Sequence, residues 1–142
     1  PGYWQKPDET AKAFHPGGWL RSGDLARRDA DGYYYIVGRS KDMYISGGSN
    51  VYPAEVENVL AEHPDILEAA IIGVPDERWG ETGEAYVMLR PGHATPSDAD
   101  LTHFLRTRLA PYKTPKRYVF MPDFPRTAAG KVQKHKLRDA AP

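Results

Sequence analysis

Apolar residues occur in short runs along the chain, and proline, glycine and charged residues separate these runs. After Pro53, three apolar residues are spaced so that one face of a helix would carry them all: Val56, Val59 and Leu60. Ser97 and Asp100 have the spacing of a capping box, and a second helical stripe follows them. The pattern therefore predicts helices over 53–63 and from Ser97 to Pro111, and a short basic helix over 132–140.

Between these helices lie β-branched and aromatic runs bounded by proline and glycine, which is typical of strands. The expected strands cover residues 43–45, 67–74, 85–89 and 117–121. Two helices packed on strands of mixed connection predict an α+β domain with a mixed sheet flanked by helices.

The first forty residues have a different pattern. Residues 8–14 have the length of two helical turns, and Asp31-Gly32 separates two strand-like runs as in a β-hairpin. We expect those strands at 19–26 and 33–37. Because the stretch lacks the apolar residues for a core, we expect residues 1–40 to belong to a missing neighbouring domain. The chain begins at Pro1 without methionine, so we expect it to be part of a longer protein.

Composition is that of a soluble globular chain, with 40% hydrophobic and 27% charged residues among 142. No apolar run approaches a membrane span, and no signal peptide is recognisable. Cysteine is absent, which excludes disulfides and thiolate metal sites and is compatible with a reducing compartment. We therefore expect a cytoplasmic protein without a membrane span.

The net charge of zero conceals an asymmetry. Residues 101–142 contain ten Lys/Arg and two Asp, a net charge of +8, so the remainder carries −8. A basic end indicates an anionic partner, such as the phosphates of a small ligand, a nucleic acid or an acidic protein surface. The alternative is a solvated basic face that complements the acidic remainder.

A few polar residues lie where loops are expected. Asp24 follows Ser22-Gly23, so its carboxylate could accept two hydroxyl groups of a ribose, although aspartate after glycine is commonly a turn residue. Arg39 could reach the same sugar or a phosphate, or could be merely exposed. Lys131, at the tip of a Pro/Gly-containing loop that we expect to be flexible, could carry an ammonium to an oxyanion or could be only solvated.

Common catalytic motifs are absent. The chain has neither a Gly-x-Gly-x-x-Gly sequence nor a Gly-x-x-x-x-Gly-Lys-Ser/Thr phosphate loop, and no serine stands in a Gly-x-Ser-x-Gly elbow. Its five histidines are scattered without metal-ligand spacing, so we expect no metal site. A complete active site is not visible.

Taken in order, several segments resemble consecutive motifs of the adenylate-forming superfamily, which comprises acyl- and aryl-CoA synthetases, adenylation domains of nonribosomal peptide synthetases, and beetle luciferases. The first is Trp-Leu-Arg-Ser-Gly-Asp, and the similarity extends from about Gly2 to Leu137. The matching segments are Gly18–Leu25, Gly32–Asp42, Ile45–Glu57, Gly73–Asp76, Arg78–Glu81, Tyr112–Lys116 and Pro125–Val132.

The resemblance implies a small mobile C-terminal domain over residues 41–142, preceded by a β-hairpin remnant of the large AMP-binding domain. Such enzymes use Mg-ATP to convert a carboxylic acid to an acyl-adenylate. The C-terminal domain of the CoA synthetases then rotates, and the thiol of CoA displaces AMP. By motif, Asp24 and Arg39 would hold the ATP or AMP ribose, Lys41 would be the hinge, and Lys131 would stabilise charge during adenylation.

For the second half-reaction, the resemblance assigns Gly47 and Gly48 to the passage for the pantetheine arm of CoA. It places Trp79, Tyr112 and Lys116 at the CoA nucleotide. Two residues depart from the family pattern: Ser22 replaces a common threonine, and Thr114 stands where some aryl-CoA ligases have arginine.

The resemblance predicts the C-terminal part of an ATP-dependent acyl-CoA ligase, with its own absent N-terminal domain, ATP, CoA and a carboxylic acid as partners. Mg would be held mainly by the absent domain, and this chain alone should be inactive. Two alternatives stay open: an adenylation domain of a nonribosomal peptide synthetase, and a basic module that binds nucleic acid or phosphate. We expect that nucleic acid is not a partner. The acid cannot be read from these residues, because its pocket would lie elsewhere.

Overall fold

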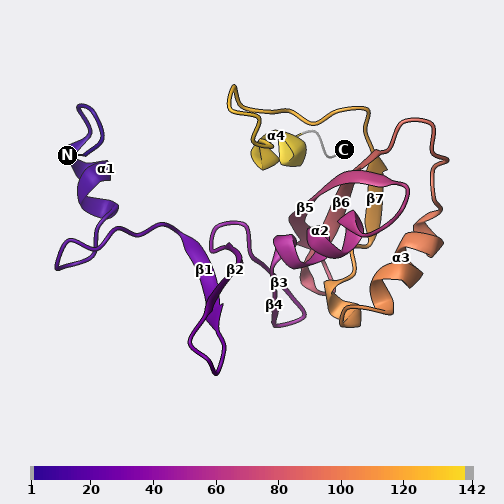
Figure 1. The fold of residues 1–142 in the computed structure, drawn as a ribbon, viewed down its shortest axis with the longest axis horizontal. Helices are drawn as coiled ribbons and strands as arrows, with labels where there is room; N and C mark the ends of the chain where they lie inside the picture. The colour runs from indigo at the N-terminus through magenta and orange to yellow at the C-terminus, as the bar shows by residue number, and fades with distance from the viewer. Residues whose placement is uncertain (1, 140–142) are drawn as a thin grey trace. The chain divides into compact units, whose positions relative to one another are not determined.

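The computed structural model describes residues 2–139. They divide into two compact units, Pro1–Lys41 and Asp42–Pro142, which are treated separately. Figure 1 shows the path of the chain through the elements of each unit.

The first unit contains one short helix and one antiparallel β-ribbon: α1 (Pro7–Lys12), β1 (Asp24–Arg28) and β2 (Tyr34–Arg39). The hairpin is therefore present where Asp31-Gly32 predicts it. Strand β1 begins five residues later than the predicted start at Trp19 and ends at Arg28, because Gly23 turns the chain with a φ of 77°. None of residues 2–41 is buried. This unit thus contains no hydrophobic core of its own.

The second unit is built on a five-stranded mixed sheet, with β6 at its centre. Strand β6 pairs antiparallel with β5 over its whole length, antiparallel with β3 at Gly80, and parallel with β7 farther along. The strands are β3 (Tyr44–Ser46), β4 (Ser49–Val51), β5 (Ile66–Asp76), β6 (Gly80–Leu89) and β7 (Arg117–Phe120).

Helices cover both faces of this sheet, and alternate residues of β5 and β6 supply the two cores. On one face, Ile71 and Val87 join residues of α2 (Pro53–Ala61) and α3 (Asp98–Arg106) in the larger hydrophobic cluster. On the other, Ile72 and Tyr86 pack with Phe124 and with Leu137 of α4 (Lys134–Asp139). The α+β fold class, with a mixed sheet flanked by helices, is confirmed.

Both longer helices form where their apolar spacing places them. Pro53 occupies the first turn of α2, where a missing N–H costs nothing. In α3, Ser97 Oγ accepts the N–H of Asp100 at 3.1 Å, which is half of the predicted capping box. Both end earlier than predicted: α2 stops at Ala61 and α3 at Arg106, and a 3₁₀ turn over Pro111–Lys113 was not predicted.

The strand bounds required larger corrections. Strand β5 continues through Pro75 to Asp76, because it is an edge strand and a proline there removes no required ladder bond. Strand β6 begins at Gly80, five residues before the predicted start, since the polar run Gly-Glu-Thr-Gly-Glu hides a central strand. Strand β4 was not predicted. Helix α4 begins at Lys134, because Val132 forms a β-bridge with Arg126; its predicted last residue, 140, lies outside the described residues.

Candidate functional site

A cleft of about 660 Å³ opens in the second unit between β3, the β5–β6 turn, α3 and the 3₁₀ turn. Trp79, Tyr112 and Lys116, which are far apart in the sequence, all line it. These are the three residues that the resemblance assigns to a nucleotide. The fold therefore brings them to one concave site.

Asp76, at the end of β5, organises one wall of the cleft. Its carboxylate accepts the backbone N–H groups of Arg78 and Trp79 at 3.0 and 2.9 Å, and the Lys116 ammonium at 2.8 Å. The ammonium of Lys116 lies 5.5 Å from the centre of the Trp79 ring. Asp76 therefore holds the indole and the lysine against each other and acts as a positioning residue. It belongs to one of the family-like motifs, but the sequence assigned it no role.

Two polar side chains that line the cleft have no partner among the described residues. Thr114 is 8% exposed, and its hydroxyl has no hydrogen-bond partner among residues 2–139. Arg106, from the end of α3, also lines the cleft and makes no ion pair with a described residue. A cleft with exposed aromatic rings and two cations suits a ligand that carries both a ring and phosphates.

The double glycine forms the turn between β3 and β4 and adjoins Trp79, which lines this cleft. Gly47 and Gly48 have φ of 56° and 79°, the left-handed region that a two-residue hairpin turn uses. The N–H of Gly47 donates to the carbonyl of Trp79 at 2.9 Å. A Cβ at Gly47 would stand 2.7 Å from the Trp79 ring, whereas one at Gly48 would meet open space. Only hydrogen fits between this turn and the indole at position 47.

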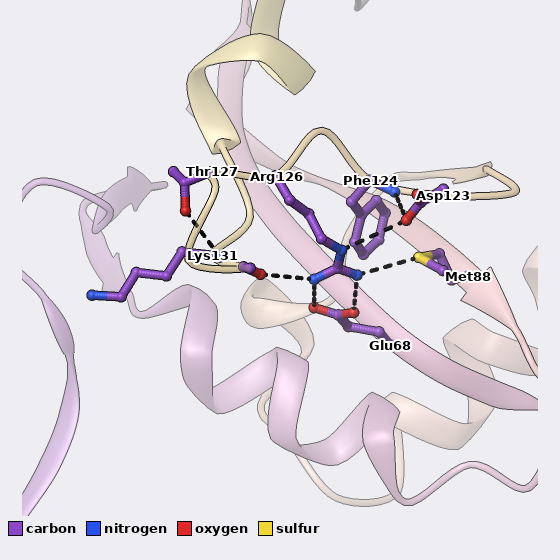
Figure 2. Close-up of polar contacts among 8 residues, drawn as sticks. Glu68, Met88, Asp123, Phe124, Arg126, Thr127 and Lys131 are labelled. Atoms are coloured by element: carbon purple, nitrogen blue, oxygen red, sulfur yellow. Dashed lines mark hydrogen bonds and ion pairs between the residues drawn. The ribbon is translucent and has the colours of Figure 1, made fainter.

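Lys131 lies in the predicted loop, which a β-bridge closes into a short hairpin. Arg126 and Val132 form an antiparallel bridge, and Thr127 N–H donates to the Lys131 carbonyl at 2.8 Å. The N–H of Lys131 donates to Thr127 Oγ1 at 3.2 Å. The side chain is exposed and extends away from the hairpin (Figure 2), and its ammonium has no partner in the part of the chain that the structure describes. The backbone is held while the cation is left available.

The Lys131 hairpin and the double-glycine turn occupy opposite ends of the β5–β6 ribbon. The hairpin is tied to Glu68, which pairs with Met88, whereas the turn adjoins Trp79 and Gly80 at the other end. The eight residue-to-residue steps from Glu68 to Asp76 span about 26 Å of extended strand. Figure 1 shows the same separation between the β3–β4 turn and the segment before α4. The sequence-predicted residues of this unit thus form two separate sites.

The first unit brings its own two candidates together. Asp24 and Arg39 face each other across β1 and β2, with Arg39 Nε 3.1 Å from Asp24 Oδ1. The N–H of Asp24 donates to Ser22 Oγ at 3.1 Å, so serine keeps the hydroxyl at that position. Lys41 is exposed and ends the unit.

Sequence reasoning missed three groups at these sites. Arg106 gave no signal, because a basic residue at the end of an amphipathic helix is ordinarily solvated. Arg126 belongs to a family-like motif in which the sequence assigned it no role. Its partner Glu68 lies 58 residues away in an otherwise apolar strand. The charge of Glu68 inside that strand was the one visible anomaly.

The stability of the Asp76 cluster should depend on pH. The Lys116 ammonium and the N–H groups of Trp79 and Arg78 hold the pKa of the Asp76 carboxyl below its ordinary value. Because the pKa of this carboxyl is lower in the folded than in the unfolded protein, the ionised carboxylate stabilises the fold. This stabilisation is complete above the unfolded-state pKa, about 4, and is lost as the pH falls through the folded-state pKa. Urea unfolding of wild type and Asp76→Asn should therefore differ most at neutral pH and converge in acid. A difference that stayed constant with pH would contradict this ionic role.

Neither a membrane helix nor a metal cluster is present in the described residues. No helix within 2–139 is long and apolar enough to cross a bilayer. In the same range, no group of three or more histidines and carboxylates is arranged to hold a metal ion.

Comparison with known proteins gave consistent matches along the chain. The family model for the AMP-binding enzyme C-terminal domain matches residues 55–131. The 2-succinylbenzoate–CoA ligase of Geobacillus kaustophilus (strain HTA426) is 48% identical over 141 residues, which is 99% of this chain and 28% of that protein. The feruloyl-CoA synthase of Amycolatopsis sp. is 50% identical over 137 residues, 96% of this chain and 28% of its own.

A solved structure agrees with these matches. The o-succinylbenzoate CoA synthetase from Bacillus subtilis, solved in complex with its acyl-adenylate intermediate, superposes with a TM-score of 0.89 at 38% identity. The superposition covers 99% of this chain and 28% of that one. The chain therefore spans just over a quarter of the length of the relatives it matches.

Proposed function

Because the chain belongs to the family of AMP-binding enzyme C-terminal domains, we propose that it is the C-terminal part of an ATP-dependent acyl-CoA ligase. The parent protein would activate a carboxylic acid as an acyl-adenylate and transfer the acyl group to CoA. The proposal is supported by about 50% identity, over nearly the whole of this chain, to enzymes named as CoA ligases. Residues 1–40 would end the large N-terminal domain, and residues 41–142 would form the mobile one.

In the adenylation step, Lys131 would meet the negative charge that develops between the carboxylate and the α-phosphate. An exposed ammonium on a held backbone suits this task, because it acts as a point charge that can be brought in and withdrawn. Asp24 and Arg39 would hold the ribose hydroxyls, since their paired side chains present both an acceptor and a donor. The carboxylate and phosphate pockets would belong to the N-terminal domain.

In the thioester-forming step, the cleft would receive the nucleotide of CoA. Trp79 and Tyr112 offer ring faces to a base, and Lys116 offers charge to a phosphate. The pantetheine arm would pass the double-glycine turn. Because the two sites lie at opposite ends of the β5–β6 ribbon, one active centre can use both only if the domain turns, with Lys41 as the hinge.

No step is assigned to Mg²⁺, because the acidic residues of this chain between 2 and 139 do not form a metal-binding group. The ion that accompanies ATP would be bound by the N-terminal domain. We accordingly expect residues 1–142 alone to form no acyl-adenylate.

The proposal is tested with the full-length parent protein and a panel of carboxylic acids. Some acid should support ATP–pyrophosphate exchange, and adding CoA should then yield AMP and an acyl-CoA. Lys116→Ala should raise the KM for CoA without slowing the exchange. Acyl transfer to a carrier protein but not to CoA would indicate the peptide-synthetase type of enzyme instead. Exchange with none of the acids, together with salt-sensitive binding of oligonucleotides, would favour the nucleic-acid alternative.

A further inference from the structure

Arg126 lies in the same hairpin as Lys131, and its guanidinium contacts several neighbouring groups (Figure 2). Its Nη1 donates to the carbonyl of Gly130 at 3.2 Å and to Glu68 Oε1 at 3.4 Å, while Nη2 donates to Glu68 Oε2 at 2.5 Å. Nη2 also lies 3.8 Å from the sulfur of Met88. The guanidinium therefore joins the sheet to the hairpin by a two-pronged contact.

The carbonyl that Arg126 holds belongs to the peptide group directly before Lys131. Gly130 has a φ of 82°, a left-handed conformation that turns the chain back toward Val132. A hydrogen bond that holds this carbonyl also holds the plane of the peptide group that leads to the Lys131 Cα. The contact thus acts on the origin of the lysine side chain without touching the ammonium.

The other end of the contact is rigid. Glu68 lies on β5, which is paired along its length with β6, and the Phe124 ring lies 5.8 Å from the guanidinium carbon and is itself 4% exposed. The chain of contacts from the sheet through Glu68 and Arg126 to Gly130 is continuous. An isolated exposed ion pair would have neither the aromatic support nor the carbonyl contact.

The two basic side chains of the hairpin differ in whether a carboxylate neutralises them. Between residues 123 and 132 the basic residues are Arg126 and Lys131. Glu68 and Asp123 neutralise Arg126, with Asp123 Oδ1 3.6 Å from its Nε, while the ammonium of Lys131 meets no carboxylate of a described residue. Only one of the two charges stays available to a ligand.

We propose that Arg126 and Glu68 form a clamp that positions Lys131 for adenylation. This inference rests on the proposed function, and it makes Arg126 and Glu68 positioning residues rather than catalytic ones. The planar fork of arginine can grip Glu68 and the Gly130 carbonyl together, which the single ammonium of a lysine cannot do. Loosening the clamp spreads the positions of the Lys131 ammonium, and misplacement of a reacting group by about 1 Å can cost up to about 100-fold in rate.

The test uses Arg126→Lys and Glu68→Gln in the full-length parent, each made alone and on a Lys131→Ala background. Arg126→Lys keeps the charge and removes the fork, and Glu68→Gln keeps the shape and removes the charge. Each single variant should slow ATP–pyrophosphate exchange about 10-fold, with an unchanged KM for ATP. Thioester formation from supplied acyl-adenylate should stay at the wild-type rate. On the Lys131→Ala background, neither substitution should cause a further loss.

A second arginine–carboxylate pair on the same unit serves as a matched control. Arg108 Nε lies 3.8 Å from Glu62 Oε2, the two residues follow the ends of α3 and α2, and neither lines the cleft or belongs to the Lys131 hairpin. Arg108→Lys and Glu62→Gln should leave both half-reactions unchanged. This comparison separates a clamp acting on Lys131 from a general effect of losing a surface ion pair.

Three results would overturn the clamp while leaving the proposed function intact: wild-type exchange by both clamp variants, equal loss in both half-reactions, or a further loss on the Lys131→Ala background. Each presupposes that Lys131→Ala itself abolishes most of the exchange. If Lys131→Ala exchanges at the wild-type rate, the role of Lys131 in adenylation fails instead, whereas the proposed function fails only if the wild-type parent exchanges with none of the acids.

Discussion

Replacing Lys131 by alanine in the full-length parent should slow acyl-adenylate formation by about 10²–10³-fold, the usual cost of removing one group that stabilises developing charge. The expectation follows from a cation whose backbone is hydrogen-bonded at both N–H and carbonyl while its ammonium meets no described partner. Thioester formation from supplied acyl-adenylate should be nearly unaffected, because that step would use the other end of the β5–β6 ribbon. ATP–pyrophosphate exchange and single-turnover acyl transfer measure the two steps separately.

Lys136→Ala is the matched control, since it removes an exposed lysine from α4 just beyond the hairpin. It changes the net charge by the same amount and should leave both rates unaltered. Equal losses in both half-reactions of Lys131→Ala would mean that the lysine serves the fold or serves both steps, and the two-site model would then be wrong.

The charge asymmetry of the sequence is mostly an internal complement. Of the ten basic residues after residue 100, six form ion pairs with carboxylates from the first hundred residues: Arg108, Lys113, Lys116, Arg117, Arg126 and Lys134. These six pairs agree with the part of that alternative in which the basic end complements the acidic remainder within the chain. Four of the ten have no such partner in the described part of the chain, and two of these four are Lys131 and Arg106. The two candidate sites each contain one of these two cations.

Sequence patterns predicted the elements whose local signals agree with their environment. The apolar stripe of α2, and the aromatic runs flanking Asp31-Gly32, needed no tertiary information. The first half of β6 could not be predicted, because Thr82 and Glu84 are buried only through the pairing of β6 with strands on both sides. Pro75 ends a strand by local rules, yet the edge position of β5 lets that strand continue.

The candidate sites were predictable only as far as the motifs reached. Asp24, Arg39 and Lys131 were identified from residue type and loop position, and the structure supplies the pairing of the first two and the hairpin of the third. The clamp could not be found, since it joins residues 58 apart whose spacing carries no pattern. Long-range ion pairs depend on strand register, which a single sequence does not reveal.

Gly47→Ala should impair thioester formation selectively, by about 10-fold or more. The left-handed φ costs about 1–2 kcal/mol for any residue with a Cβ. The new Cβ would also stand 2.7 Å from the Trp79 ring, so the indole must move in the cleft proposed to receive the CoA nucleotide. Adenylation should be retained, because the Lys131 hairpin is at the far end of the ribbon. Steady-state rates at varied CoA, beside ATP–pyrophosphate exchange, measure the two effects.

Gly92→Ala separates the contact with Trp79 from backbone strain alone. Gly92 has a φ of 80°, and a Cβ there would meet nothing within 4 Å. The control should lower the unfolding midpoint less than Gly47→Ala does, because it adds the backbone strain without the contact, and it should leave both half-reactions at wild-type rates. If the two variants affected CoA transfer equally, the loss would arise from strain and not from the indole. If Gly47→Ala instead impaired exchange and left acyl transfer intact, the turn would serve adenylation. Its assignment to the thioester-forming step would then be wrong.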